Sequence, residues 1–167
     1  MTDQIESTKL FSICLASESN QVHEWKHIAW VIRLRVESKR YPSNYRSVIL
    51  QPKQFSYFNP WTSGKQSALR KDSANPVLTE EQVISEALKG YAGDIYSKWT
   101  DELRSCVMGV TSARLWECPF PLDTLHYYSP VSMRPRGSKP PWAASARLLI
   151  TPSGVDSDRF IFAAGVK

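Results

Sequence analysis

Apolar residues repeat at helical spacing from Val22 to about Ser38, and this repeat defines the first element of the fold. One side of the repeat is apolar and the other is polar: Val22, Trp25, Ile28, Ala29, Ile32 and Val36 against His23, Lys26, Arg33 and Glu37. Intervals of three and four place the apolar set on one face of an α-helix. We therefore expect an amphipathic helix here, ended by Tyr41-Pro42 because proline lacks a backbone donor.

The flanking segments predict further elements. Residues 5–18 fit a short helix, and Ser19 or Asn20 could cap the helix that follows. Residues 47–61 combine β-branched residues with two prolines, which predicts an irregular, aromatic-rich segment, and residues 62–76 look like a polar loop. Thr79-x-x-Gln82 resembles a capping box that opens a helix running to about Arg104 or beyond, with Gly90 and Gly93 as points of bending or breakage.

The last third of the chain differs in composition. Most of the eleven prolines fall between Pro119 and Pro152, which predicts a long loop over 119–152 held down by aromatics. Residues 146–166 contain two β-rich runs around a Pro-Ser-Gly turn, which indicates a hairpin or strand pair. The chain thus reads as one α+β, mostly helical domain over 1–167, with a core at about 10–130 and the loop and hairpin at about 119–167.

Charge and cysteine content limit the partners. The net charge is +5, but the basic residues are scattered rather than gathered in one block, so we expect no nucleic-acid partner. Cys14, Cys106 and Cys118 are an odd number at unrelated spacings and are expected as small core residues rather than disulfides. The first residues fit neither a signal peptide nor a membrane span, so we expect synthesis in the cytoplasm and no membrane insertion.

Residues 23–27, HEWKH, fit the pattern H-E-x-x-H, in which two histidines bind zinc and the glutamate is a general base. A zinc peptidase needs a third ligand, and the helix continues without a histidine at the extended position. Glu80, Glu81 or Glu86 could serve in principle. A helix-start acid such as Glu24 is also favoured by the helix dipole alone, as an exposed first-turn residue. We therefore expect no metal and no cofactor, with the zinc peptidase as a third-ranked alternative.

A different acid, Glu18, begins an ordered series of short motifs. The series runs Glu18-Ser19, Glu24-Trp25, Ile28-Ala29-Trp30-Val31-Ile32, Arg35-Val36, Tyr41-Pro42, Val48-Ile49-Leu50-Gln51-Pro52 and Gln54-Phe55-Ser56. It resembles the cell-wall hydrolase family that includes the spore-cortex-lytic enzymes. A second block resembles phage-encoded members: His126-Tyr127-Tyr128-Ser129-Pro130, Met133, Pro140-Pro141-Trp142 and residues 158–166. The chain departs from the family at Leu34, where asparagine is usual, and at Ser17 and Ser19, which flank the acid.

The resemblance implies a lysozyme-like fold that cleaves peptidoglycan between N-acetylmuramic acid (MurNAc) and N-acetylglucosamine (GlcNAc). Glu18 would be the general acid, since an acid among apolar residues can have its pKa raised. Glu24 is a possible second carboxylate, but no motif supplies an obvious one, so a lytic transglycosylase that uses one glutamate is preferred. The residues expected to bind substrate, on resemblance, are Gln54, Phe55, Ser56, Tyr127 and Tyr128, with Tyr57 and Trp142 as further stacking candidates.

The same resemblance suggests a phage setting. The enzyme would leave the host cytoplasm by a separate route, or act on the wall as a virion component with other virion proteins as partners. The alternative from a second class is an inactive structural or adaptor protein of the virion on the same scaffold, for which Leu34 is the main support.

Overall fold

The computed structural model describes residues 2–51, 54–58, 81–82, 85 and 94–167, with side chains left out for residues 2–6 and 94–100. The fold is α+β and mostly helical, as the sequence predicted. Its helices are α1 (Thr2–Glu18), α2 (Val22–Glu37), α3 (Tyr45–Ile49) and α6 (Asp94–Ser112). Its strands are β1 (Thr124–Tyr128), β2 (Leu148–Ile150) and β3 (Ile161–Ala164), and its 3-10 turns are η1 (Ser56–Phe58), η2 (Leu115–Glu117), η3 (Pro130–Ser132) and η4 (Pro141–Ser145).

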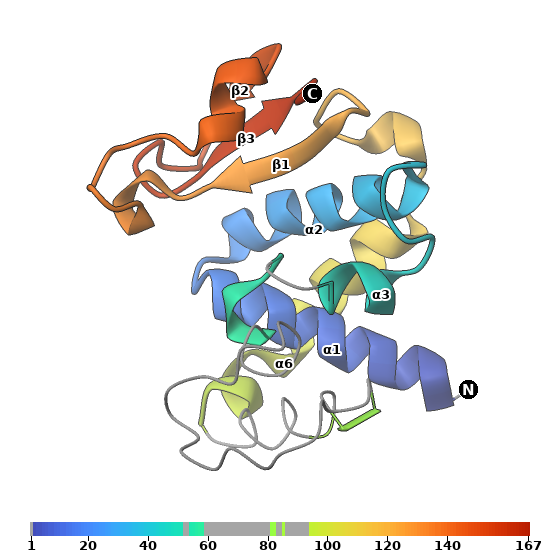
Figure 1. Cartoon of the computed structure of the whole chain (residues 1–167). Coiled ribbons are helices and arrows are strands. Elements are labelled where there is room, and N and C mark those ends of the chain that lie inside the picture. The colour runs from blue at the N-terminus through green and yellow to red at the C-terminus, as the bar shows by residue number, and fades with distance from the viewer. Residues whose placement is uncertain (1, 52–53, 59–80, 83–84, 86–93) are drawn as a thin grey trace, which may run out of the picture.

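Helix α2 is the centre of the molecule. The sheet covers one of its sides, and α1, α3 and α6 lie on the other (Figure 1). The predicted helix is confirmed, but it is buried over more than the apolar stripe, and Trp30, Val31 and Leu34 are also in the core. The reason is that α2 has packing partners on both sides, whereas an amphipathic pattern anticipates one.

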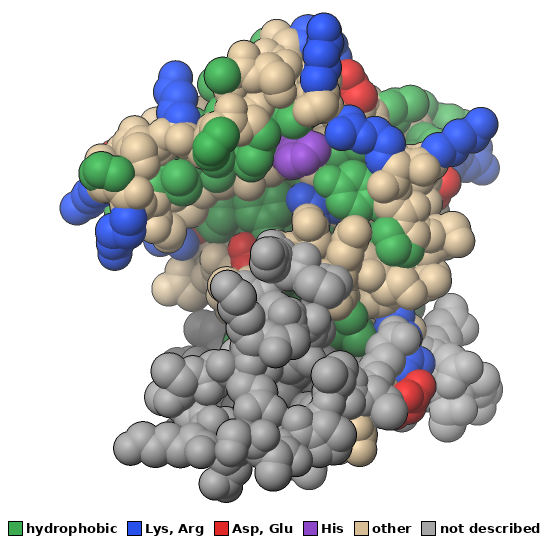
Figure 2. Space-filling model, viewed as in Figure 1, with side chains coloured by type: hydrophobic (Ala, Val, Ile, Leu, Met, Phe, Trp, Pro, Cys, Tyr) green, Lys and Arg blue, Asp and Glu red, His purple; other side chains and the backbone are tan. Residues whose placement is uncertain are grey.

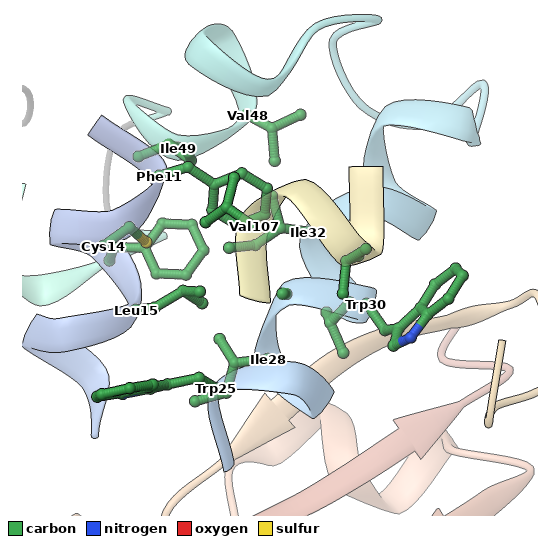
Figure 3. Packing of buried hydrophobic residues seen from close by; sticks show 14 of the residues in the cluster. Phe11, Cys14, Leu15, Trp25, Ile28, Trp30, Ile32, Val48, Ile49 and Val107 are labelled. Atoms are coloured by element: carbon green, nitrogen blue, oxygen red, sulfur yellow. The ribbon is translucent and has the colours of Figure 1, made fainter. Parts of the chain in front are cut away.

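The main core lies between α2 and the other helices. Figure 3 shows Phe11 and Leu15 of α1 meeting Ile28 and Ile32 of α2, with further side chains from α3 and α6 closing the cluster. Each fully buried side chain of this size contributes roughly 1.5–3 kcal/mol of transfer free energy. This packing fixes the last turns of α1, and therefore the position of the residue that ends it, Glu18.

The turn between α1 and α2 departs from the predicted capping. The residue at the N-cap of α2 is Gln21, which makes no side-chain capping bond, rather than Ser19 or Asn20. Ser19 lies two residues earlier, where its Oγ accepts a hydrogen bond from the Gln21 amide at 3.0 Å. The serine hydroxyl thus organises the turn instead of the first helical turn.

The segment after α2 was predicted to be irregular from residue 47, and this was wrong at its start. Residues 45–49 form α3, whose first turn is capped by the Asn44 side chain accepting from the Ser47 amide at 2.8 Å. The predicted loop over 62–76 and the residues Thr79, Gly90 and Gly93 lie outside the described residues. The helix was predicted to run to about Arg104 or beyond, and α6 ends at Ser112.

The three strands form an antiparallel sheet in the order β1-β3-β2, with Tyr127 opposite Phe162 and Leu149 opposite Ala163. The predicted C-terminal strand pair is therefore confirmed as β2 and β3. The loop predicted over 119–152 was partly wrong, because β1 lies inside it. Prolines at 119, 121 and 130 flank the strand without interrupting its five residues.

Lys and Arg side chains are spread over the sheet and its loops in Figure 2 rather than gathered into one block. Within the described ranges, no helix is both long enough and apolar enough to span a membrane.

Candidate active site

A polar cavity of about 490 Å³ lies where the end of α1 meets the sheet and residues 54–56. Five stretches of the chain contribute to its wall, and they come together only in the folded state. The lining residues are Ser17, Glu18, Arg35, Gln54, Ser56, Tyr127, Tyr128, Ser129, Val131, Ser132, Arg159 and Phe160.

Glu18 is the last residue of α1, and its carboxyl group is the acid at this cavity. The Tyr127 hydroxyl donates a hydrogen bond of 2.8 Å to Glu18 Oε2. Burial raises the pKa of Glu18 above its ordinary value, although the Tyr127 hydrogen bond and the positive charge of Arg35 oppose the rise. A carboxyl group in this setting retains its proton to higher pH than an exposed glutamate, as a general acid must.

The sheet fixes the position of the Tyr127 side chain. It lies in β1 opposite Phe162, and its ring packs against Phe160 and Phe162 at centroid distances of 5.9 and 5.8 Å. Burial, and then the negative charge of Glu18, raise the pKa of the Tyr127 hydroxyl well above its usual range. The phenol therefore stays protonated and acts as the donor to Glu18.

Arg35 brings a cation to the same cavity from α2. Its Nε donates to the Leu125 carbonyl at 2.8 Å, and its guanidinium lies 5.1 Å from the Tyr41 ring centroid. Arg35 was not predicted from the sequence as a site residue. A signal was present, because Arg35 falls three residues after Ile32, on the apolar stripe of the helix, where a charged residue is unusual.

Glu24 has a different environment from Glu18. Its side chain is fully buried, where it accepts hydrogen bonds from Arg159 Nε at 2.7 Å and from the Ser19 hydroxyl. Burial alone would raise the pKa of Glu24, but the hydrogen bonds from Arg159 and Ser19 outweigh it and hold the pKa below the ordinary value. The alternative of an exposed first-turn acid is therefore wrong: an ion pair brings this carboxylate into the interior.

Among the predicted substrate-binding residues, the structure brings Gln54, Ser56, Tyr127 and Tyr128 to one cavity with Glu18. Phe55 is not part of that wall. It is only 1% exposed and packs in the core, because the turn at 54–56 directs its two polar neighbours outward and the ring inward. Its assignment as a substrate-binding residue is corrected on this ground.

Three other residues singled out in the sequence lie away from the cavity wall. Tyr57 packs edge-on against Phe58, and Trp142 packs against Tyr128 at a centroid distance of 5.7 Å. Leu34 is a core residue at 2% exposure. The residue that departs from the expected pattern, Leu34, therefore lies in the core and is not among the lining residues of the cavity.

The HEWKH residues do not converge on a common point. His27 Nδ1 lies 2.8 Å from the His23 carbonyl, while Glu24 turns inward to Arg159. Of the third ligands considered, Glu80 and Glu86 lie outside the described residues, and Glu81 pairs with Arg46 at 2.8 Å. No group of three potential metal ligands occurs in the part of the chain that the structure describes.

A mostly buried carboxyl group with a raised pKa, set in the wall of a polar cavity, is an arrangement that general acid catalysis requires. The family follows from the sequence comparison. Residues 19–110 match the family model described as Cell Wall Hydrolase, which is more than half of the chain, so the protein belongs to the cell wall hydrolase family. Peptidoglycan, the polymer of that wall, is accordingly what the enzyme degrades.

The matched segment and the cavity overlap only in part. Residues 19–110 contribute Arg35, Gln54 and Ser56, whereas Glu18 and Tyr127 lie on either side of the match. No match was found among curated proteins or among solved structures.

Proposed function

We propose that the protein is a lytic transglycosylase that cleaves the glycosidic bond between MurNAc and GlcNAc, with Glu18 as its general acid and base. The observation that carries this proposal is the setting of Glu18: a mostly buried carboxyl group with a raised pKa, hydrogen-bonded by Tyr127 in the wall of a polar cavity. Gln54 and Ser56 supply neutral hydrogen-bonding groups to the same wall, which suits a sugar.

The proposed reaction uses one carboxyl group twice. Protonated Glu18 donates its proton to the glycosidic oxygen, and the bond from that oxygen to C1 of MurNAc breaks. The resulting carboxylate then accepts the proton of the C6 hydroxyl of the same sugar as O6 bonds to C1. The products are a GlcNAc-ended strand and a 1,6-anhydro-MurNAc end, and Glu18 is again protonated.

The placement of Glu24 supports a mechanism with one carboxylate. Hydrolysis through two carboxylates requires the second to face the sugar or a water molecule. Within the described lining of the cavity, Glu18 is the sole carboxylate, and Glu24 is held by Arg159 and Ser19 behind the wall. Glu24 is therefore proposed as a structural residue.

The proposed setting is a phage that breaches the wall of its bacterial host. The motif block from His126 to Val166 supports it, since that block resembles phage-encoded members of the family. Other virion proteins are proposed partners if the enzyme is carried in the particle. The adaptor alternative predicts binding to virion components without cleavage of glycan.

Product analysis tests this proposal. Purified peptidoglycan is incubated with the wild-type protein, with Glu18→Gln and with Asp101→Asn, an exposed acid on α6 that serves as the matched control. Fragments are read by mass spectrometry. Anhydro-MurNAc ends from the wild type and Asp101→Asn, and none from Glu18→Gln, are expected. Reducing ends that carry an added water would show a hydrolase instead of a transglycosylase. Cut stem peptides would indicate a peptidase, and the absence of any fragments would favour the adaptor alternative.

A further inference from the structure

The guanidinium of Arg35 is held rigidly although most of its donors are unused. The residue is 5% exposed, and Nε is bound to the Leu125 carbonyl. The rings of Tyr41 and Phe55 lie 5.1 and 5.7 Å from the guanidinium carbon and limit its rotation. A planar cation is thus held in the wall of the cavity by its own neighbours.

The remaining donors of Arg35 have no partner in the described part of the chain. A guanidinium carries five N–H donors, and Nε supplies the one hydrogen bond that Arg35 makes there. Nη1 is shielded from solvent and unpaired, whereas Nη2 is not among the shielded, unpaired atoms of the described residues. Burying a cation without full pairing is costly, and because Arg35 lines the cavity, a ligand there can supply the missing acceptor.

The other charged groups at the cavity are already committed. Arg159 is bound by Glu24 through both Nε and Nη2, and Glu18 accepts the Tyr127 hydroxyl. Among the described residues of the lining, Arg35 is the cation without an ion pair, whereas Arg159 is paired with Glu24. Guanidinium groups select planar oxygen acceptors, such as carbonyl and carboxylate oxygens, over hydroxyl groups because two N–H bonds lie in one plane.

We propose that Arg35 binds an acyl oxygen of an amino-sugar substituent and thereby selects N-acylated glycans over plain glucans. This inference rests on the proposed function, since it assumes that a glycan strand occupies the Glu18 cavity. The acyl oxygen comes from one of two sources, the acetamido group of either sugar or the lactyl group of MurNAc.

The test measures ligand preference by calorimetric titration in the Glu18→Gln background, where ligands stay intact. The probes are chitotetraose, cellotetraose, and a tetrasaccharide of alternating GlcNAc and MurNAc. Chitotetraose and cellotetraose share a β-1,4 backbone and differ in carrying acetamido or hydroxyl groups. Arg35→Gln is compared with Arg147→Gln, which removes one positive charge from an exposed arginine paired with Asp123, away from the cavity lining.

We expect Arg35→Gln to reduce the preference for chitotetraose over cellotetraose by about tenfold, the effect of one lost charge-assisted hydrogen bond. If the lactyl group is the source, the preference lost is instead that for the MurNAc tetrasaccharide over chitotetraose. Arg147→Gln should change neither. Arg35→Lys retains the positive charge but lacks the planar guanidinium, so it should lose the same ligand preference. Because the charge is kept, this variant should disturb the fold less than Arg35→Gln.

Two contrary results are distinguishable. Unchanged preferences in folded Arg35→Gln and Arg35→Lys would overturn the role of Arg35 and leave the proposed function standing. No binding of any acylated probe by the Glu18→Gln protein with Arg35 intact would overturn the glycan site itself, and both proposals with it.

Discussion

The two glutamates on either side of the α1–α2 turn show how the pKa of one residue type is shifted in opposite directions within one small region. Both side chains are largely withdrawn from solvent, but Glu18 meets a neutral phenol while Glu24 meets a guanidinium and a serine hydroxyl. Burial raises the pKa of Glu18, whereas hydrogen bonds hold the pKa of Glu24 down. At Glu18 burial outweighs the Tyr127 hydrogen bond and the charge of Arg35, whereas at Glu24 the hydrogen bonds from Arg159 and Ser19 outweigh burial.

The difference has a structural consequence. The ionised Glu24 joins the start of α2 to Arg159, which precedes β3 and lines the cavity. Glu24 thereby helps to set the wall against which Glu18 acts. We propose that Glu18 performs the chemistry and that Glu24 holds the structure, a division that substitutions at the two residues can test.

The largest effect is expected from Glu18→Gln, which keeps the shape of the side chain and removes its titrating proton. Loss of the general acid should lower the rate of peptidoglycan cleavage by about 10²–10⁴-fold. The rate is measured from the clearing of a cell-wall suspension, with circular dichroism to confirm the fold. Activity within a few-fold of wild type would show that another group supplies the proton.

Glu24→Gln should instead act on stability. Replacing the carboxylate weakens the bonds to Arg159 and Ser19 and should lower the free energy of unfolding by about 1–3 kcal/mol at neutral pH. Because the folded state holds the pKa of Glu24 low, this stabilisation is present above the unfolded-state pKa and is lost as pH falls through the folded-state pKa. Urea denaturation of both proteins at several pH values measures it.

A double-mutant cycle with Arg159→Met sharpens the same point. The two single changes should be far from additive, because each removes the same ion pair. Additive losses of unfolding free energy would mean that Glu24 and Arg159 stabilise the fold independently. If Glu24→Gln lowered the rate of cleavage as much as Glu18→Gln does, Glu24 would instead be a catalytic residue.

Tyr127→Phe should shift the pH dependence of cleavage. The Tyr127 hydroxyl lowers the pKa of Glu18, so its removal should raise that pKa further. The active general acid is the protonated form, and activity is lost as pH rises through its pKa. The alkaline limb of kcat/KM should therefore move to higher pH in Tyr127→Phe. If the alkaline limb stayed in place or moved to lower pH, the Tyr127 hydroxyl would not be what lowers the pKa of the catalytic acid.

The smallest effect on activity is expected from His23→Ala, since His23 is exposed and lies outside the cavity lining. Cleavage should stay within about twofold of wild type, the range expected of a surface change, and a chelator should not alter it. Loss of cleavage together with loss of bound zinc would indicate instead that the HEWKH residues bind a catalytic zinc ion.

The sequence predicted the parts of the fold that depend on local repeats. Helix α2 and the β2–β3 pair follow from spacing that acts over a few residues. Strand β1 was hidden because prolines around it suggested a loop, although its partner β3 lies more than thirty residues later. Pairing over such a distance leaves no trace in local composition.

The residues of the site that belong to short sequence motifs were predictable. The ion pair that forms between distant parts of the chain was not. Glu18, Gln54 and Ser56 stand in recognisable motifs and reach one cavity. The burial of Glu24 could not be read from its own helix, because it depends on Arg159 arriving from the far end of the chain. Phe55 was grouped with its polar neighbours, and only the folded turn separates the ring from them.

The most direct test of the account is the titration of both side chains by NMR, with carbon-13 at the glutamate carboxyl carbons and assignments from Glu18→Gln and Glu24→Gln. The account predicts that Glu18 titrates above, and Glu24 below, the ordinary glutamate value of 4.5. Two carboxyl groups titrating together near that value, or in the reverse order, would contradict the assignment of Glu18 as the acid and Glu24 as the structural carboxylate.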